Sequence, residues 1–99
     1  GRCGMATYIM LSRLTDQGAR TVKEHPEHIL EVNDELAAMG VKVVQQFATL
    51  GRVDFVNVVE APDTETVTRA SLELGARGSI RIETLPAMPV ADLIGMLKE

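Results

Sequence analysis

The stretch that decides the fold is Thr7-Tyr8-Ile9-Met10-Leu11-Ser12, close to the start of the chain. It is rich in β-branched and bulky residues, which favours a β-strand. Successive side chains of a strand point to opposite faces of its sheet. Ile9 and Leu11 therefore share one face, and Tyr8 and Met10 share the other. Because both sets are apolar, we expect both faces of this strand to be buried.

Two helical segments are predicted after this strand. A short helix capped by Thr15 or Asp16 runs to about Glu24, although Gly18 weakens its first turn. A main helix is predicted over Pro26–Met39, because proline suits the first position of a helix. Gly40 is a good left-handed cap and ends the main helix.

The rest of the chain alternates strands and helices. The expected elements are strands over 41–50 and 55–61, a helix from Pro62–Asp63 to Leu74 with Val67, Ala70, Ser71 and Leu74 inward, a strand over 79–85 between turn glycines and prolines, and a final helix over 90–97. The order βαββαβ, with a last helix added, is typical of an α+β, ferredoxin-like fold. We therefore expect a four-stranded antiparallel sheet with the first and third strands central and the helices on one face.

The predicted sheet needs a partner on its second face. The strand over 55–61 also carries apolar groups on both sides, and the two main helices can cover only one side. The final helix is short, so a second copy of the sheet would cover the other face better. We therefore expect a homodimer or higher homo-oligomer that packs through the sheet face.

Composition excludes several classes of function. The 99 residues suit one domain, and the net charge of −4 without a Lys/Arg run argues against nucleic acid as a partner. The apolar stretches are too short to span a membrane, and no signal peptide is recognisable. Residues 1–4 resemble a cloning remnant before Met5, which gives a single domain over 5–99. Cys3 is the only cysteine, so a thiolate metal site is not expected and the location is predicted to be cytoplasmic.

Three segments carry a likeness to a known family. They are Met5-Ala6-Thr7-Tyr8-Ile9 with Leu14-Thr15 and Gly18, the hairpin Thr49-Leu50-Gly51-Arg52-Val53-Asp54-Phe55-Val56, and Gly75-Ala76-Arg77-Gly78 followed by Thr84-Leu85-Pro86-Ala87. Together they resemble the GYD family over nearly all of residues 5–97. The resemblance implies a ferredoxin-like protomer that forms a dimeric α/β barrel, and it implies no particular activity.

One position departs from the family pattern. The family is named for Gly-Tyr-Asp at the hairpin, and this chain has Val53 where the tyrosine is expected. Any role of that tyrosine therefore does not carry over. Gly51 and Asp54 do carry over, and we interpret both as turn residues, because glycine supplies a positive φ and aspartate caps turn N–H groups.

The first candidate site lies on the predicted open sheet face. Alternation groups Tyr8 of the first strand with Asn57 of the third, with Arg81 and Glu83 at the margin. Polar groups that converge in an apolar pocket are typical of a small-molecule site. The alternative is that Tyr8 and Asn57 hydrogen bond each other or a partner chain, and the pattern favours this alternative.

Two weaker candidates have ordinary structural interpretations. His25 and His28 are three residues apart, but Pro26 lies between them and no third ligand is evident, so a solvated helix start is favoured over a zinc or haem site. The loop Gly75-Ala76-Arg77-Gly78 follows a helix, where the dipole has the wrong sign for phosphate, so a helix cap explains it better.

The function favoured by the sequence is that of a non-enzymatic homo-oligomeric domain that binds a small ligand on the open face, without a cofactor or metal. The alternative is an enzyme of the cofactor-free monooxygenase or haem-binding type. A third hypothesis is that the chain is a subunit of a larger hetero-assembly.

Overall fold

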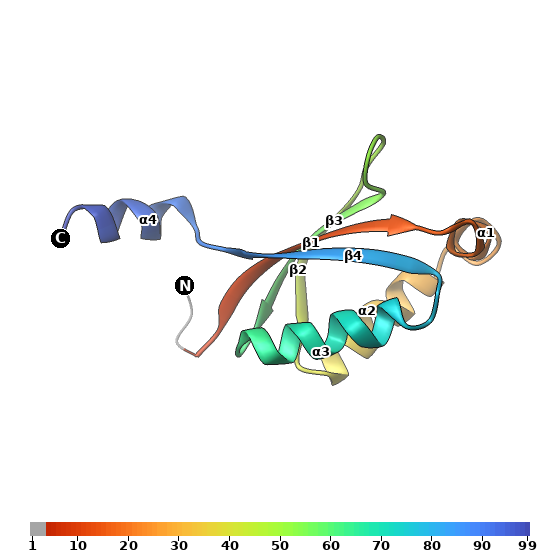
Figure 1. Ribbon diagram of the computed structural model, residues 1–99, viewed down its shortest axis with the longest axis horizontal. Helices are drawn as coiled ribbons and strands as arrows, with labels where there is room; N and C mark the ends of the chain where they lie inside the picture. Colours follow the sequence, from red (N-terminus) through yellow and green to blue (C-terminus); the bar gives the residue numbers. More distant parts are fainter. Residues whose placement is uncertain (1–3) are drawn as a thin grey trace.

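The computed structural model describes residues 4–99, so most of the predicted remnant at residues 1–4 lies outside it. The elements are β1 (Ala6–Leu14), α1 (Asp16–Glu24), α2 (His28–Ala38), β2 (Lys42–Ala48), β3 (Phe55–Ala61), α3 (Thr64–Gly75), β4 (Ile80–Ala87) and α4 (Val90–Leu97). The strands form one antiparallel sheet in the order β2-β3-β1-β4. The α+β, ferredoxin-like prediction is confirmed, with β1 and β3 at the centre (Figure 1).

Helix starts follow the side chains that cap them. The Thr15 Oγ1 accepts a hydrogen bond from the Gly18 N–H at 3.2 Å, and the Asp63 carboxylate accepts one from the Thr66 N–H at 2.8 Å. Both bonds satisfy N–H groups that a first turn leaves free. The main helix begins later than predicted, at His28, because Pro26 lies in a turn closed by the His28 N–H and the His25 carbonyl at 3.0 Å.

The two edge strands also differ from the prediction. β4 runs past Leu85 to Ala87, with Pro86 paired opposite Tyr8. A proline, which has no backbone N–H, is tolerated there because β4 is an edge strand whose outer side forms no hydrogen bonds with another strand. β2 is shorter than the predicted 41–50, and its register with β3 shifts between Val43 and Gln45, as at a β-bulge.

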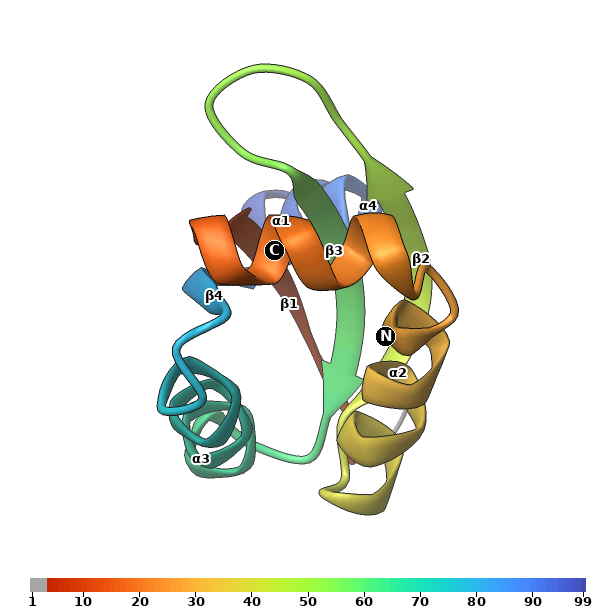
Figure 2. The ribbon, with the colours of Figure 1, turned by 90° about the vertical axis from the view of Figure 1, so that its right-hand side faces the viewer.

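Helix α1 lies across the end of the strands, and helices α2 and α3 cover one face of the sheet (Figure 2). The buried core lies between them and the sheet, and its members are aliphatic apart from one tyrosine: Tyr8, Met10, Leu36, Val41, Val59, Ala61, Val67, Ala70 and Leu74. Each fully buried valine, leucine or methionine side chain of this core contributes about 1.5–3 kcal/mol to stability. The inward residues predicted for α3 are buried or half-buried here, as expected.

The opposite face of the sheet is left open. Its central side chains Ile9, Leu11, Val56 and Val58 are only partly buried, and no helix of residues 4–99 packs on them. Helix α4 projects beyond the end of the sheet (Figure 1) and gives the molecule a length of 51 Å. Helix α4 therefore does not cover the second face of the sheet.

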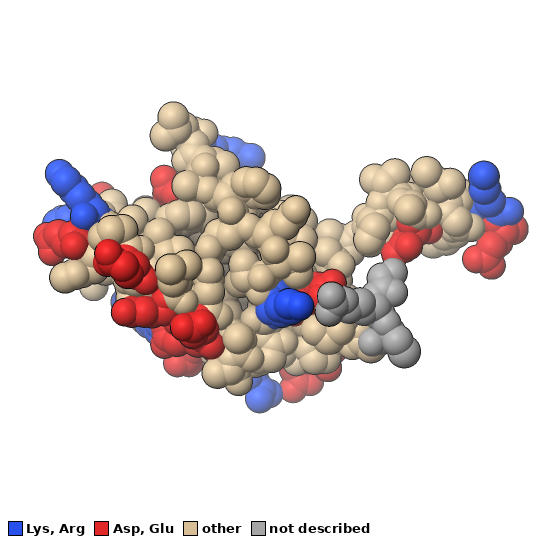
Figure 3. Space-filling view, turned by 180° about the vertical axis from the view of Figure 1, so that it is seen from behind, with Lys and Arg blue, Asp and Glu red and all other residues tan. Residues whose placement is uncertain are grey.

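The exposed side of α4 is apolar. Its stripe of large apolar side chains is between 40 and 72% exposed and consists of Val90, Leu93, Ile94 and Leu97. In Figure 3 this helix carries few charged groups, whereas acidic side chains gather over the end of the molecule where α1 and α2 lie. Across residues 4–99, none of the helices combines the length and apolarity that spanning a membrane would require.

Candidate functional site

The four residues predicted to share one site lie on opposite faces of the sheet. Asn57 pairs with Met10, and Tyr8 pairs with Val59, so both side chains point to the helix-covered face. Arg81 and Glu83 lie opposite Arg13 and Leu11, on the open face. The predicted grouping of Tyr8, Asn57, Arg81 and Glu83 is therefore wrong, because the helices cover the face that was expected to be open.

Tyr8 has a structural partner of its own. It is 3% exposed, and its hydroxyl lies 2.9 Å from the Thr64 Oγ1 at the start of α3. Neither of the contacts predicted for it, with Asn57 or with a partner chain, is needed to satisfy this hydroxyl. On the other face, Arg81 and Glu83 line a depression of about 260 Å³ together with Leu11, Arg13, Arg52, Val53 and Ile82.

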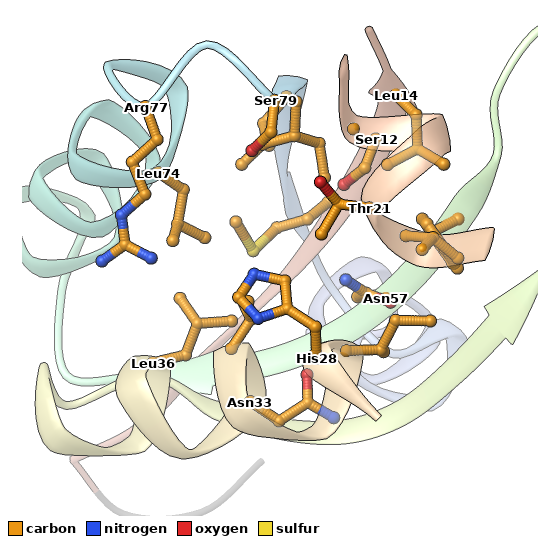
Figure 4. Close-up of a pocket in the computed structure, with 18 of the residues that line it drawn as sticks. Ser12, Leu14, Thr21, His28, Asn33, Leu36, Asn57, Leu74, Arg77 and Ser79 are labelled. Atoms are coloured by element: carbon orange, nitrogen blue, oxygen red, sulfur yellow. The ribbon is translucent and has the colours of Figure 1, made fainter. Parts of the chain in front are cut away.

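A larger cavity of about 290 Å³ lies on the helix-covered side, between the sheet and helices α1 and α2, with the end of α3 at its border (Figure 4). Its apolar wall includes Met10, Leu14, Val22, Ile29, Val32, Leu36, Phe55, Leu74, Ile80 and Ile82. Polar groups from three strands and two helices also reach it, among them Ser12, Asn57, Gln46, Thr21 and Asn33. An apolar cavity with a few convergent polar groups is the usual form of a small-molecule site.

Several polar groups of this cavity are paired, whereas the buried Oδ1 of Asn57 is not. Asn33 and Gln46 exchange two hydrogen bonds, with Asn33 Nδ2 donating at 2.8 Å and Gln46 Nε2 donating at 3.2 Å. The Oδ1 of Asn57 is buried and has no hydrogen-bond partner among the described residues. A buried carbonyl oxygen without a donor costs about 1–3 kcal/mol. Asn57 is therefore the polar group of this cavity that most needs a partner.

An ion pair closes one side of the cavity mouth. The Arg77 guanidinium donates from two nitrogens to the Glu35 carboxylate at 2.9 and 2.8 Å and so connects α2 to the turn after α3. This hydrogen bonding holds the pKa of Glu35 below its ordinary value of 4.5 and raises the pKa of Arg77. The Arg77–Glu35 ion pair therefore joins α2 to the turn after α3, and it balances the charge of Arg77 without a phosphate.

The Arg77–Glu35 ion pair is expected to make a contribution to stability that is lost in acid. A carboxylate with a lowered folded-state pKa stabilises the fold above its unfolded pKa, and this stabilisation is lost as the pH falls through the folded value. We expect wild type to be more stable than Glu35→Gln at neutral pH, and the difference measured by urea unfolding to shrink as the pH falls below 4.5 towards about 3. Asp34→Asn, which neutralises an exposed neighbour on α2, serves as control. A wild-type advantage that persists unchanged at that pH would contradict this account.

The hairpin residues carried over from the family behave as turn residues. Gly51 has a φ of 117°, which favours glycine. The Asp54 carboxylate accepts from the Leu14 N–H at 2.8 Å, and the Asp54 N–H donates to the Ser12 carbonyl at 2.8 Å. Val53 contributes its main-chain carbonyl, which accepts from the Thr49 Oγ1 at 2.8 Å, so this bond does not depend on a tyrosine there.

Asp54 is expected to be important for stability. Asp54→Ala leaves the Leu14 N–H at the end of β1 without its acceptor, so the free energy of unfolding should fall by about 2 kcal/mol. Asp54→Asn retains a side-chain oxygen and should recover part of this loss, as measured by urea unfolding. Equal losses in the two variants would show that the side-chain acceptor is not the cause.

The two weaker candidates lie at the start of α2 and in the turn into β4. The His28 Nδ1 lies 3.0 Å from the Glu31 Oε1, and within residues 4–99 His, Cys, Asp and Glu form no group of three that could hold a metal ion. Gly78 has a φ of 82° in the turn into β4, and its carbonyl accepts from the Thr15 Oγ1 at 2.8 Å. That loop acts as a helix end and an attachment point for α1.

Comparison with known proteins agrees with this fold. An uncharacterized protein from Thermotoga maritima matches with a TM-score of 0.51 over 85% of this chain and 99% of that one, and its 18% identity makes this a likeness of fold alone. The chain is 59% identical over 95 residues to the glutamine synthetase and cystathionine beta-lyase binding protein of Thermus thermophilus, across 95% of this chain and 100% of that protein. The model of the GYD domain matches residues 8–97, and the chain therefore belongs to the GYD domain family.

Proposed function

We propose that this chain is a non-enzymatic protein-binding domain whose targets are glutamine synthetase and cystathionine beta-lyase. The observation that carries the proposal is the 59% identity to a protein named for binding these two enzymes, because the match spans the whole of that relative. Two apolar surfaces on the outside of the molecule, the open sheet face and the stripe on α4, also support a role in association.

The binding role is tested by mixing the chain with each enzyme of its own organism. Size-exclusion chromatography with light scattering should show a complex that contains both proteins at micromolar concentration. An unrelated enzyme of similar size and charge should elute separately and serves as control. Two independent peaks in both mixtures, confirmed by calorimetry without heat of binding, would refute the proposal.

We further propose that the chain acts as a homo-oligomer in which the open sheet faces pack together. Ile9, Leu11, Val56 and Val58 lie on this face and are only partly buried in the single chain. Burial of apolar area against an identical face would stabilise a two-fold pair. Leu85 and Ala87 of β4 extend the same face towards α4, so the two apolar surfaces are continuous along one strand.

Val58→Lys tests this arrangement because Val58 lies on a central strand, opposite Ile9 and Gln45. A lysine there would bury a charge between the two sheets, so we expect association to weaken by about a hundredfold or more and a monomeric mass in light scattering. Thr68→Lys adds the same charge on the exposed side of α3 and should leave the mass unchanged. A wild-type protein that is monomeric at micromolar concentration would refute the homo-oligomer.

A further inference from the structure

The cavity under the helices has the properties of a ligand site that is separate from the apolar outer surfaces. We propose that it binds a small neutral molecule with a carboxamide-like head, in which a carbonyl lies beside an N–H, and that the side-chain amide of Asn57 recognises this head. The site is independent of the protein-binding role proposed above, since its residues lie on the opposite side of the sheet.

The size and lining of the cavity set the class of ligand. About 290 Å³ would hold roughly ten water molecules at about 30 Å³ each, which corresponds to a ligand with a similar number of non-hydrogen atoms. The wall is mainly aliphatic, with Phe55 as its aromatic member, so the body of the ligand must be apolar.

Asn57 sets the polar head of the ligand. It is 8% exposed, lines the cavity and reaches it from the central strand β3 (Figure 4). Within residues 4–99, its Oδ1 accepts no hydrogen bond and its Nδ2 donates none, so both groups are available to a ligand. An asparagine amide offers an acceptor and donors side by side. A carboxamide is complementary to it, since its N–H can donate to Oδ1 while its carbonyl accepts from Nδ2.

The charges around the cavity favour a neutral ligand. His28 and Arg77 are the ionisable side chains that line it, and each is engaged at the mouth, by Glu31 and Glu35 respectively. The lining contains no acidic side chain and no lysine. A charged ligand would therefore lose its hydration without gaining a counter-ion, which is strongly unfavourable.

Two probes of the same shape separate recognition of the head from simple filling of the cavity. Benzamide carries the carboxamide, and α-methylstyrene replaces its carbonyl and amino groups by carbon. Both are titrated by two-dimensional ¹H–¹⁵N NMR into wild type, into Asn57→Leu, and into Gln45→Leu. Gln45→Leu makes the same kind of change at an exposed residue of β2 that does not line the cavity, and it serves as the matched control.

We expect benzamide to bind wild type in the millimolar range, with shifts at Asn57 and its neighbours in the cavity. Asn57→Leu should weaken benzamide by about tenfold or more, because two hydrogen bonds are lost, and should strengthen α-methylstyrene. Gln45→Leu should leave both affinities unchanged. The proposal is overturned if benzamide does not saturate, if its shifts lie outside the cavity, or if Asn57→Leu weakens both probes equally.

Discussion

Gly18→Ala is expected to destabilise the chain by about 3 kcal/mol, the largest effect that a single methyl group should have in this fold. Gly18 is buried in the first turn of α1, and a Cβ built on it would overlap the main-chain carbonyl oxygen of Ser79. Because that oxygen belongs to the backbone, no rotamer change can relieve the overlap. The same oxygen accepts from the Thr15 N–H at 3.1 Å, so moving it also disturbs the start of α1.

Gly75→Ala is the matched control for this prediction. Gly75 ends α3, and a Cβ added there meets no atom within 4 Å. Alanine in a helix is better than glycine by up to about 1 kcal/mol, so this variant should be as stable as wild type or slightly more stable. Urea unfolding of both variants tests the pair, and a Gly18→Ala variant with wild-type stability would contradict the close approach of α1 to Ser79.

The second large effect is expected at α4. Leu93→Asp with Leu97→Asp places two charges in the apolar stripe, and both leucines are exposed in the single chain. If the stripe is buried in the proposed oligomer, the association free energy should fall by about 4 kcal/mol, roughly a thousandfold in the dissociation constant. The circular dichroism of the protomer should barely change, because α4 projects beyond the sheet and none of its residues is buried (Figure 1).

A charge on the other side of α4 controls for a general effect of acidic residues. Gly95→Asp lies away from the stripe, because at 3.6 residues per turn Gly95 falls nearly opposite the middle of the stripe. This variant should keep the wild-type mass in light scattering. If all three charged positions lower the mass equally, the stripe is not the contact surface.

The strand pattern predicted the sheet well but did not predict which face the helices cover. Tyr8 and Met10 alternate with Ile9 and Leu11, and both sets are apolar. Alternation alone therefore does not show which face of the sheet the helices cover. The charged residues carried a usable signal. Arg13, Arg81 and Glu83 all fall on the face of Leu11, and charged side chains are rarely buried without partners. That face had to be the more exposed one, which places Asn57 under the helices.

Other features required three-dimensional information. From the sequence alone, Gly18 is only a residue that weakens a helix. The structure shows why a glycine is needed there: the main chain of Ser79, 61 positions later in the chain, leaves no room for a Cβ. The period of α4 identifies its apolar stripe, but the direction in which the helix leaves β4 depends on the backbone at Met88 and Pro89. Local patterns fix the elements, and contacts distant in sequence fix how they are placed.

Both borders of the sheet are interrupted, and this limits how the chain can polymerise. The bulge in β2 between Val43 and Gln45 distorts one border, and Pro86 removes an N–H from the other. Strand-to-strand addition at such borders is unfavourable, and it is the route by which sheets grow into fibrils. Concentrated solutions of this protein should therefore contain closed assemblies of defined mass and no thioflavin-positive filaments.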